Sequence, residues 1–236
     1  MNNNFDDIWE ENYSKGQALN KYPYGELVSI FFNSLKYATT PVEKILEVGC
    51  GAGNNLWFLG ELGFNTYGID GSETVVKKAK DACQLRGVKA DIRHGYFNSM
   101  PFEDDSMDMV IDRESICCGT KKIIKESLKE IKRVLKNNGS FIHATPNATS
   151  LRSRIELLNG DVPAWFKNFE HIRMWTRKYL NTTLKQYGFR ESHFTGCFVS
   201  DSKLGKVYSM FFPNTSPIFI QKFILKNDVA ANIEIK

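Results

Sequence analysis

Apolar and polar positions follow two patterns along the middle of this chain, one typical of buried strands and one typical of amphipathic helices. Short apolar runs, such as Ile45, Leu46 and Val48, predict buried strands. Apolar residues spaced three and four apart predict helices between them. The expected strands are residues 45–48, 65–70, 89–93, 106–112 and 140–145, and the expected helices are 55–62, 72–82 and a long helix from about 123 that stops at 137–139. This alternation indicates a parallel sheet with right-handed crossovers.

Further elements flank the alternating region on both sides. Pro41 closes an N-terminal segment of two helical stripes, and the alternation breaks after Pro146 into an excursion over residues 147–175. Thr176 is a plausible N-cap and Gly188 lies just past the end of the helix that follows. The additional elements are helices over 5–13, 26–37, 150–158 and 176–187, strands over 189–199 and 218–225, and a tail from about 227.

A glycine-rich loop follows the first strand, in the stretch Ile45 to Asn55. It reads Glu47-x-Gly49-x-Gly51-x-Gly53, and it leads directly into a helix. A strand, a glycine turn and a helix together place backbone N–H groups and a helix N-terminus beside a nucleotide-like ligand. A dinucleotide fingerprint wants glycine or alanine three residues after Gly51, where this chain has Asn54.

This loop resembles motif I of the class I, Rossmann-like methyltransferases that use S-adenosylmethionine (SAM). The resemblance extends over about residues 5–200 and is closest to small-molecule O-methyltransferases of the ubiquinone-biosynthesis type. It implies a doubly wound, mostly parallel seven-stranded sheet with helices on both faces, an N-terminal helical cap and a lid after the fifth strand. Within a single domain of residues 1–236, the implied parts are the cap (1–41), a SAM-binding core (42–146), an acceptor lid (147–175) and the C-terminal part of the sheet (176–226).

The cofactor-binding residues follow from the loop, the strand ends and the resemblance. Asp70 ends the second strand, where a carboxylate can accept hydrogen bonds from both ribose hydroxyls. The family commonly has an acidic residue where Tyr96 stands, so we expect Phe97 to stack on the adenine, unless it is a core residue. The full set is Tyr13, Glu47, Gly49, Gly51, Gly53, Asp70, Gly71, Ser72, Tyr96, Phe97 and Asp112.

Three residues are candidates for catalysis. Arg113 and Glu114 follow the fourth strand, and His171 lies in the excursion expected to roof the acceptor pocket. Arg113 either anchors an anion or pairs with a neighbouring carboxylate. His143 lies within the fifth strand and is expected to be a core histidine. No Pro-Pro-aromatic motif follows the fourth strand, which argues against methylation of DNA adenine or of glutamine. No side-chain spacing suggests a metal site.

The excursion suggests an anionic acceptor. Arginine pairs bidentately with phosphate or carboxylate, and aromatic side chains stack on planar groups. The alternative is a solvated lid with an aromatic underside. The residues concerned are Arg152, Arg154, Trp165, Phe166, Lys167, Phe169, His171, Arg173, Trp175 and Arg177.

The composition mainly argues against certain classes of partner and location. The net charge of +4, from 31 basic and 27 acidic residues, does not demand a nucleic-acid partner. The lysines of residues 121–133 are interpreted as a solvated helix face balanced by Glu126 and Glu130. No secretory signal or bilayer-spanning run is expected, and five cysteines without paired spacing suggest a reducing cytoplasm.

These features together predict an enzyme. It would move a methyl group from SAM, leaving S-adenosylhomocysteine (SAH), to a hydroxyl of a small anionic metabolite. A sugar nucleotide or phosphorylated compound of surface-polysaccharide synthesis is one such acceptor. No DNA or membrane partner is expected and RNA is disfavoured, while the oligomeric state stays open. The alternatives are an RNA-modifying methyltransferase, a non-catalytic SAM-binding module, and a nicotinamide dehydrogenase, which Asn54 disfavours.

Overall fold

The computed structural model describes residues 5–36, 38, 40–162, 175–197 and 218–226. Its helices are α1 (Asp7–Ser14), α2 (Gly25–Lys36), α3 (Asn54–Glu61), α4 (Glu73–Leu85), α5 (Lys121–Val134), α6 (Leu151–Leu158) and α8 (Arg177–Lys185), with a 3-10 turn η1 (Ile116–Cys118). Its strands are β1 (Lys44–Val48), β2 (Asn65–Asp70), β3 (Ala90–His94), β4 (Met107–Arg113), β5 (Leu135–Pro146), β6 (Phe189–Cys197) and β7 (Ile218–Leu225).

The seven strands form one doubly wound sheet in the order β3-β2-β1-β4-β5-β7-β6. Strands β1 to β5 are parallel, whereas β7 runs antiparallel to both β5 and β6. The chain order reverses direction between β1 and β4, so the carboxyl ends of these strands form the crevice where such sheets bind ligands. The predicted doubly wound, mostly parallel seven-stranded sheet is confirmed.

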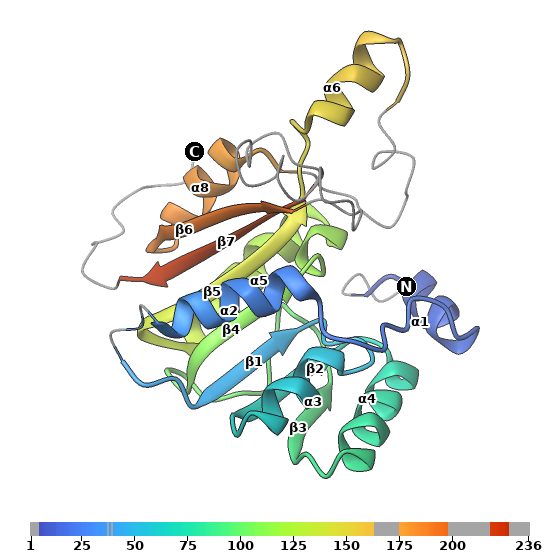
Figure 1. The fold of residues 1–236 in the computed structure, drawn as a ribbon, viewed down its shortest axis with the longest axis vertical. Coiled ribbons are helices and arrows are strands. Elements are labelled where there is room, and N and C mark those ends of the chain that lie inside the picture. Colours follow the sequence, from blue (N-terminus) through green and yellow to red (C-terminus); the bar gives the residue numbers. More distant parts are fainter. Residues whose placement is uncertain (1–4, 37, 39, 163–174, 198–217, 227–236) are drawn as a thin grey trace.

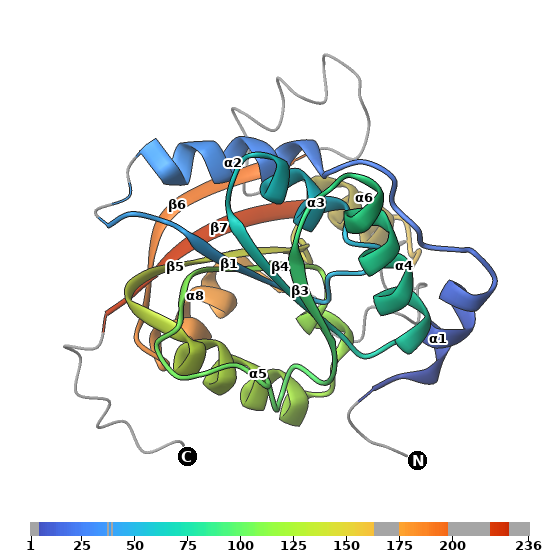
Figure 2. The same ribbon diagram turned by 90° about the horizontal axis from the view of Figure 1, so that it is seen from below.

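Helices cover both faces of the sheet, as Figure 2 shows with α2 and α3 on one side and α5 on the other. Under α5 and α8 lies a core that includes Leu46, Val110 and Phe141, all fully buried. The opposite core, under α2 and α3, includes Ile45 and Met109. Successive residues of β1 therefore point to opposite cores, as a strand buried on both faces requires.

The two N-terminal helices lie in different places (Figure 1). Helix α2 packs on the sheet beside β5 and β7, whereas α1 lies against α4 at the carboxyl edge of the sheet. Helix α6 projects beyond the end of β5.

The predicted end of the long helix is wrong by a few residues. Helix α5 stops at Val134, and Leu135 is already extended and pairs with Met107 of β4. Leu135 is fully buried, and its apolar side chain suits the helix stripe and the strand equally well. The turn expected at residues 137–139 lies inside β5, where Asn138 adopts a left-handed φ of 66°. Helix α4 extends three residues beyond its expected end, to Leu85, and β5 begins at Leu135 instead of residue 140, whereas the other element boundaries agree to within two residues.

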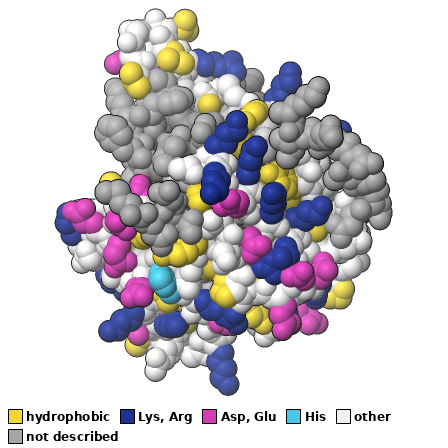
Figure 3. Space-filling model, turned by 180° about the vertical axis from the view of Figure 1, so that it is seen from behind, with side chains coloured by type: hydrophobic (Ala, Val, Ile, Leu, Met, Phe, Trp, Pro, Cys, Tyr) yellow, Lys and Arg dark blue, Asp and Glu magenta, His cyan; other side chains and the backbone are white. Residues whose placement is uncertain are grey.

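The outer face of α5 carries charges of both signs, as expected (Figure 3). Lys122 lies 3.9 Å from Glu126, and Arg133 donates to Glu130 at 2.8 Å. Glu130 also accepts a hydrogen bond from the backbone N–H of Met100. These acidic residues therefore tie α5 to the segment after β3 as well as balancing its basic residues.

Removing the N-cap of α8 should destabilise the protein measurably. The Thr176 hydroxyl accepts a hydrogen bond from the backbone N–H of Tyr179, as the sequence predicted. Thr176→Ala should lower the free energy of unfolding by about 1 kcal/mol, whereas Thr176→Ser should retain it. Thr182→Ala is the matched control, because its exposed hydroxyl only bonds the carbonyl of Lys178 within the helix. Equal losses for both alanine variants in urea unfolding would contradict the capping role.

Candidate functional site

The glycine loop after β1 depends on left-handed backbone. Gly49, Gly51 and Gly53 have φ of 68°, 51° and 75°, a region that other residues enter at a cost. A Cβ on Gly49 would lie 2.0 Å from the Ser115 hydroxyl, and one on Gly53 would lie 3.0 Å from Ala79. The absence of a side chain at Gly49 therefore allows the turn after β4 to pack against the glycine loop, and its absence at Gly53 allows α4 to do so.

Asp70 links this loop to the start of α4. One carboxylate oxygen accepts the N–H of Gly51 at 2.9 Å, and the other accepts the N–H of Ser72 at 3.0 Å. Burial raises the pKa of Asp70 to about 6, against the lowering effect of the two N–H donors. Ser72 itself caps α4, because its hydroxyl accepts a hydrogen bond from the backbone N–H of Val75. Asp70 thus presents a fixed carboxylate with free lone pairs beside the glycine loop.

Glu47 is the second buried carboxylate of this region. Its Oε1 accepts the Asn55 amide at 2.6 Å, while Oε2 has no hydrogen-bond partner among the described residues. Burial raises the pKa of Glu47 to about 8, and the Asn55 hydrogen bond opposes that shift. A buried oxygen without a partner costs free energy unless a ligand or water supplies a donor. Glu47 therefore fits a ligand with N–H or O–H groups.

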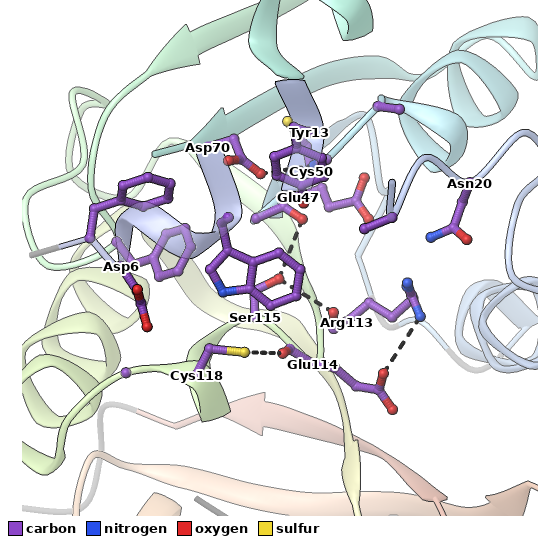
Figure 4. Close-up of a pocket in the computed structure, with 18 of the residues that line it drawn as sticks. Asp6, Tyr13, Asn20, Glu47, Cys50, Asp70, Arg113, Glu114, Ser115 and Cys118 are labelled. Carbon is purple, nitrogen blue, oxygen red and sulfur yellow. Dashed lines mark hydrogen bonds and ion pairs between the residues drawn. The ribbon is translucent and has the colours of Figure 1, made fainter. Parts of the chain in front are cut away.

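A cavity of about 580 Å³ opens over these groups at the carboxyl ends of β1, β2 and β4. Figure 4 shows Asp70 and Tyr13 toward one end of the cavity, Glu114 toward the other, and Glu47 and Arg113 between them. The described lining consists of Phe5, Asp6, Asp7, Trp9, Tyr13, Ala18, Asn20, Glu47, Gly49, Cys50, Gly51, Ala52, Asn54, Asp70, Phe97, Arg113, Glu114, Ser115, Cys118, Gly119, Thr120 and Ile123.

Helix α1 covers the end of the cavity that contains Asp70. The Phe5 ring packs on Gly71, where a Cβ would lie 2.2 Å from it. Lys78 of α4 donates to the carbonyl of Tyr13 at 3.0 Å. Burial, followed by the charge of Asp70, raises the pKa of Tyr13, so its hydroxyl stays protonated. Tyr13 thus lines the cavity as a neutral hydrogen-bonding group.

Asp112 lies behind the cavity wall rather than in its lining. Its side chain is fully buried and accepts His143 Nδ1 at 2.6 Å and the N–H groups of Ser115 and Ile116 at 3.0 and 3.1 Å. These contacts fix the turn that presents Glu114 and Ser115 to the cavity. His143 is buried in the core, as expected.

Arg113 and Glu114 line the cavity side by side in sequence, at the end of β4. Arg113 Nη1 lies 3.6 Å from Glu114 Oε2, and the guanidinium carbon lies 5.3 Å from the centre of the Tyr24 ring. Arg113 therefore pairs with a neighbouring carboxylate, which was one of the two expectations for it. The Arg113 side chain also lines the cavity. His171 falls outside the described residues.

The predicted residues divide into two groups in the structure. Those in the lining are Tyr13, Glu47, Gly49, Gly51, Asp70, Phe97, Arg113 and Glu114, whereas Gly53, Gly71, Ser72, Tyr96 and Asp112 are not part of it. Sequence reasoning gave no role to Trp9, Asn20, Ser115 or Cys118, which also line the cavity. Ser115 and Cys118 lie in the turn that follows β4, and that position was the available signal. Asn20 lies in a loop with no pattern.

Within the described ranges, no group of three or more His, Cys, Asp or Glu side chains is arranged to hold a metal ion. No described helix has the length and apolar character needed to cross a membrane.

Comparison with known proteins agrees with this geometry. Residues 46–143 match the family described as a methyltransferase domain. An uncharacterized methyltransferase of Bacillus subtilis, YodH, is 31% identical over 107 residues, which cover 45% of each chain. The chain therefore spans about half the length of the curated relatives that it matches first.

Solved structures share the fold. The YcgJ protein of Bacillus subtilis superposes with a TM-score of 0.64 at 17% identity, over 86% of this chain and all of that one. The magnesium protoporphyrin IX methyltransferase of Synechocystis, solved with bound SAH, gives a TM-score of 0.64 at 15% identity, over 86% of this chain and 83% of that one. With the glycine loop and the buried Asp70, the family match identifies residues 46–143 as a methyltransferase domain, and the solved structures show that the chain has the class I, Rossmann-like fold.

Proposed function

We propose that the protein transfers a methyl group from SAM to a hydroxyl of a small, anionic acceptor. The observation that carries the proposal is the shared cavity, whose lining includes the glycine loop and Asp70 as well as Arg113 and Glu114. A volume of about 580 Å³ lies within the range of small-molecule sites. Donor and acceptor can therefore meet in one enclosure, as in-line transfer requires.

The cofactor end of the cavity fits SAM by its hydrogen-bonding chemistry. Asp70 is the group for the ribose hydroxyls, and the unpartnered Oε2 of Glu47 suits the ammonium of the methionyl part. Phe97 lines the same cavity and is the candidate for stacking on the adenine. When bound, SAM supplies an electrophilic methyl group on a sulfonium, and SAH is the product.

At the acceptor end, Arg113 is the proposed anchor for an anion. Phosphate or carboxylate pairs well with a guanidinium, which suits a sugar nucleotide or a phosphorylated metabolite, such as one used in surface-polysaccharide synthesis. His171 and the arginines of the excursion remain proposed contributors. The free thiols of Cys50 and Cys83 support a cytoplasmic location.

Calorimetric titration tests the cofactor. SAM and SAH should bind with a stoichiometry of one, whereas NAD should not bind. Binding of NAD without SAM would overturn the proposal.

Methyl-labelled SAM incubated with cell extract then tests the acceptor. We expect label in small molecules that bind an anion-exchange resin. Label in RNA would show the RNA-modifying alternative, and SAM binding without any labelled product would show a binding module. Label in neutral small molecules would contradict the proposed anionic character of the acceptor but would leave the proposed methyl transfer intact.

A further inference from the structure

Glu114 has an unusual backbone for a residue other than glycine. It follows the last residue of β4 with a left-handed φ of 60°. Its N–H donates to the carbonyl of Ala144 at 3.0 Å, and its carbonyl accepts Cys117 Sγ at 3.0 Å and Cys118 Sγ at 3.3 Å. Such strain persists only where the surroundings over-determine it, and it is concentrated at functional sites.

The carboxylate that this backbone presents is only partly satisfied. The Glu114 side chain is 15% exposed and lines the cavity. Its Oε2 lies 3.6 Å from Arg113, beyond hydrogen-bond distance, and its Oε1 is buried without a partner among the described residues. Burial of an unpaired carboxylate oxygen is costly, so this atom is available to a donor that enters the cavity.

Three other described acid–base groups near the cavity are less suitable. Both oxygens of Asp70 already accept backbone N–H groups. His143 is committed to Asp112 and is absent from the lining. Glu47 is held by Asn55 on the glycine-loop side, where the cofactor is expected.

We propose that Glu114 is the catalytic base of the methyl transfer, which rests on the proposed function. Oε1 accepts a hydrogen bond from the acceptor hydroxyl and takes its proton. The acceptor oxygen forms a bond to the methyl carbon, and the carbon–sulfur bond breaks with its electron pair left on sulfur. The products are the methyl ether, SAH and a protonated Glu114.

This assignment also defines the acceptor more closely. An acceptor that binds here presents a hydrogen-bond donor to Glu114 and carries its anionic group on the side of Arg113. The adjacent opposite charges of Arg113 and Glu114 thus select a hydroxyl close to an anionic group, rather than a bare anion.

The variant Glu114→Gln tests the assignment, because the amide keeps the size of the side chain but cannot take a proton. Label transfer from SAM into the small molecules of cell extract should fall about 10²- to 10⁴-fold. SAM affinity by calorimetry should stay within twofold. Formate should restore part of the activity of Glu114→Ala, an effect that a purely structural role would not produce. Glu103→Gln, an exposed glutamate on a loop, is the control and should behave as wild type.

Thermal unfolding of the ligand-free protein supplies a second readout. If Glu114 served as a structural ion pair, Glu114→Gln would lower the melting temperature. We expect a melting temperature equal to or above that of wild type, because a buried, half-satisfied carboxylate is removed. Undiminished transfer by Glu114→Gln, or a lowered melting temperature without formate rescue of Glu114→Ala, would overturn the assignment. Failure of SAM to bind wild type would instead overturn the proposed function.

Discussion

Asp70→Asn is expected to weaken SAM binding about tenfold to a hundredfold, because a charged acceptor is lost at about 1.5–3 kcal/mol per hydrogen bond. Both Asp70 oxygens accept backbone N–H groups, from Gly51 and Ser72. An amide must place its NH₂ group against one of these donors, so the variant also loses an internal hydrogen bond. Calorimetric titration of SAM measures the effect, and Asp104→Asn is the exposed control.

Asp70 also predicts how SAM affinity depends on pH. Burial raises its pKa to about 6, so the carboxylate is protonated increasingly as the pH falls through that value. Protonation removes acceptor capacity, so the dissociation constant for SAM should rise by up to about tenfold per pH unit below 6. Glu47, with a pKa of about 8, is protonated throughout this range in the ligand-free protein and contributes equally in wild type and in Asp70→Asn. The contribution of Asp70 is therefore the difference between the slopes of the two proteins between pH 5 and 7. Constant affinity over this range, or the same slope in Asp70→Asn, would contradict the ribose role.

Asp112→Ala should cost about 3–5 kcal/mol of unfolding free energy, because a fully buried acceptor of three hydrogen bonds is removed. The carboxylate is fully buried and accepts from His143, Ser115 and Ile116. Its loss leaves three buried donors without partners and opens space beside the β4 turn. Urea unfolding should show a lower midpoint with an unchanged slope.

The matched control for this variant is Asp104→Ala. Asp104 pairs with Arg133 at 2.6 Å, and its side chain is 73% exposed, so its removal should cost no more than about 1 kcal/mol. Similar losses for the two variants would show that Asp112 does not organise the β4 turn.

Hydrophobic periodicity was sufficient to predict the strands of the parallel sheet. Runs such as Ile45 to Val48 are buried on both faces, and a pattern of that kind identifies parallel strands without knowledge of their neighbours. The end of α5 was less predictable, because Leu135 continues the apolar stripe of the helix while also filling a strand position. A single apolar residue at a boundary fits both periods, and only the pairing with β4 decides between them.

For the site, strand ends pointed to Asp70 and Glu114, which line the cavity, and to Asp112, which does not. All three carboxylates lie at or just after the end of a strand. Asp112 lies behind the cavity because His143, 31 residues later, bonds its side chain. Such long-range hydrogen bonds leave no periodic trace in the sequence, and neither does the left-handed backbone of Glu114.

The close approach of Gly49 and Ser115 links two segments that are 66 residues apart. A Cβ on Gly49 would overlap both the hydroxyl and the Cβ of Ser115, at 2.0 and 2.3 Å. Across relatives, a side chain at the position of Gly49 should therefore occur only with glycine, or with a shortened turn, at the position of Ser115. The two segments should evolve as a unit, so a chimera that exchanges the glycine loop without the β4 turn should fail to fold.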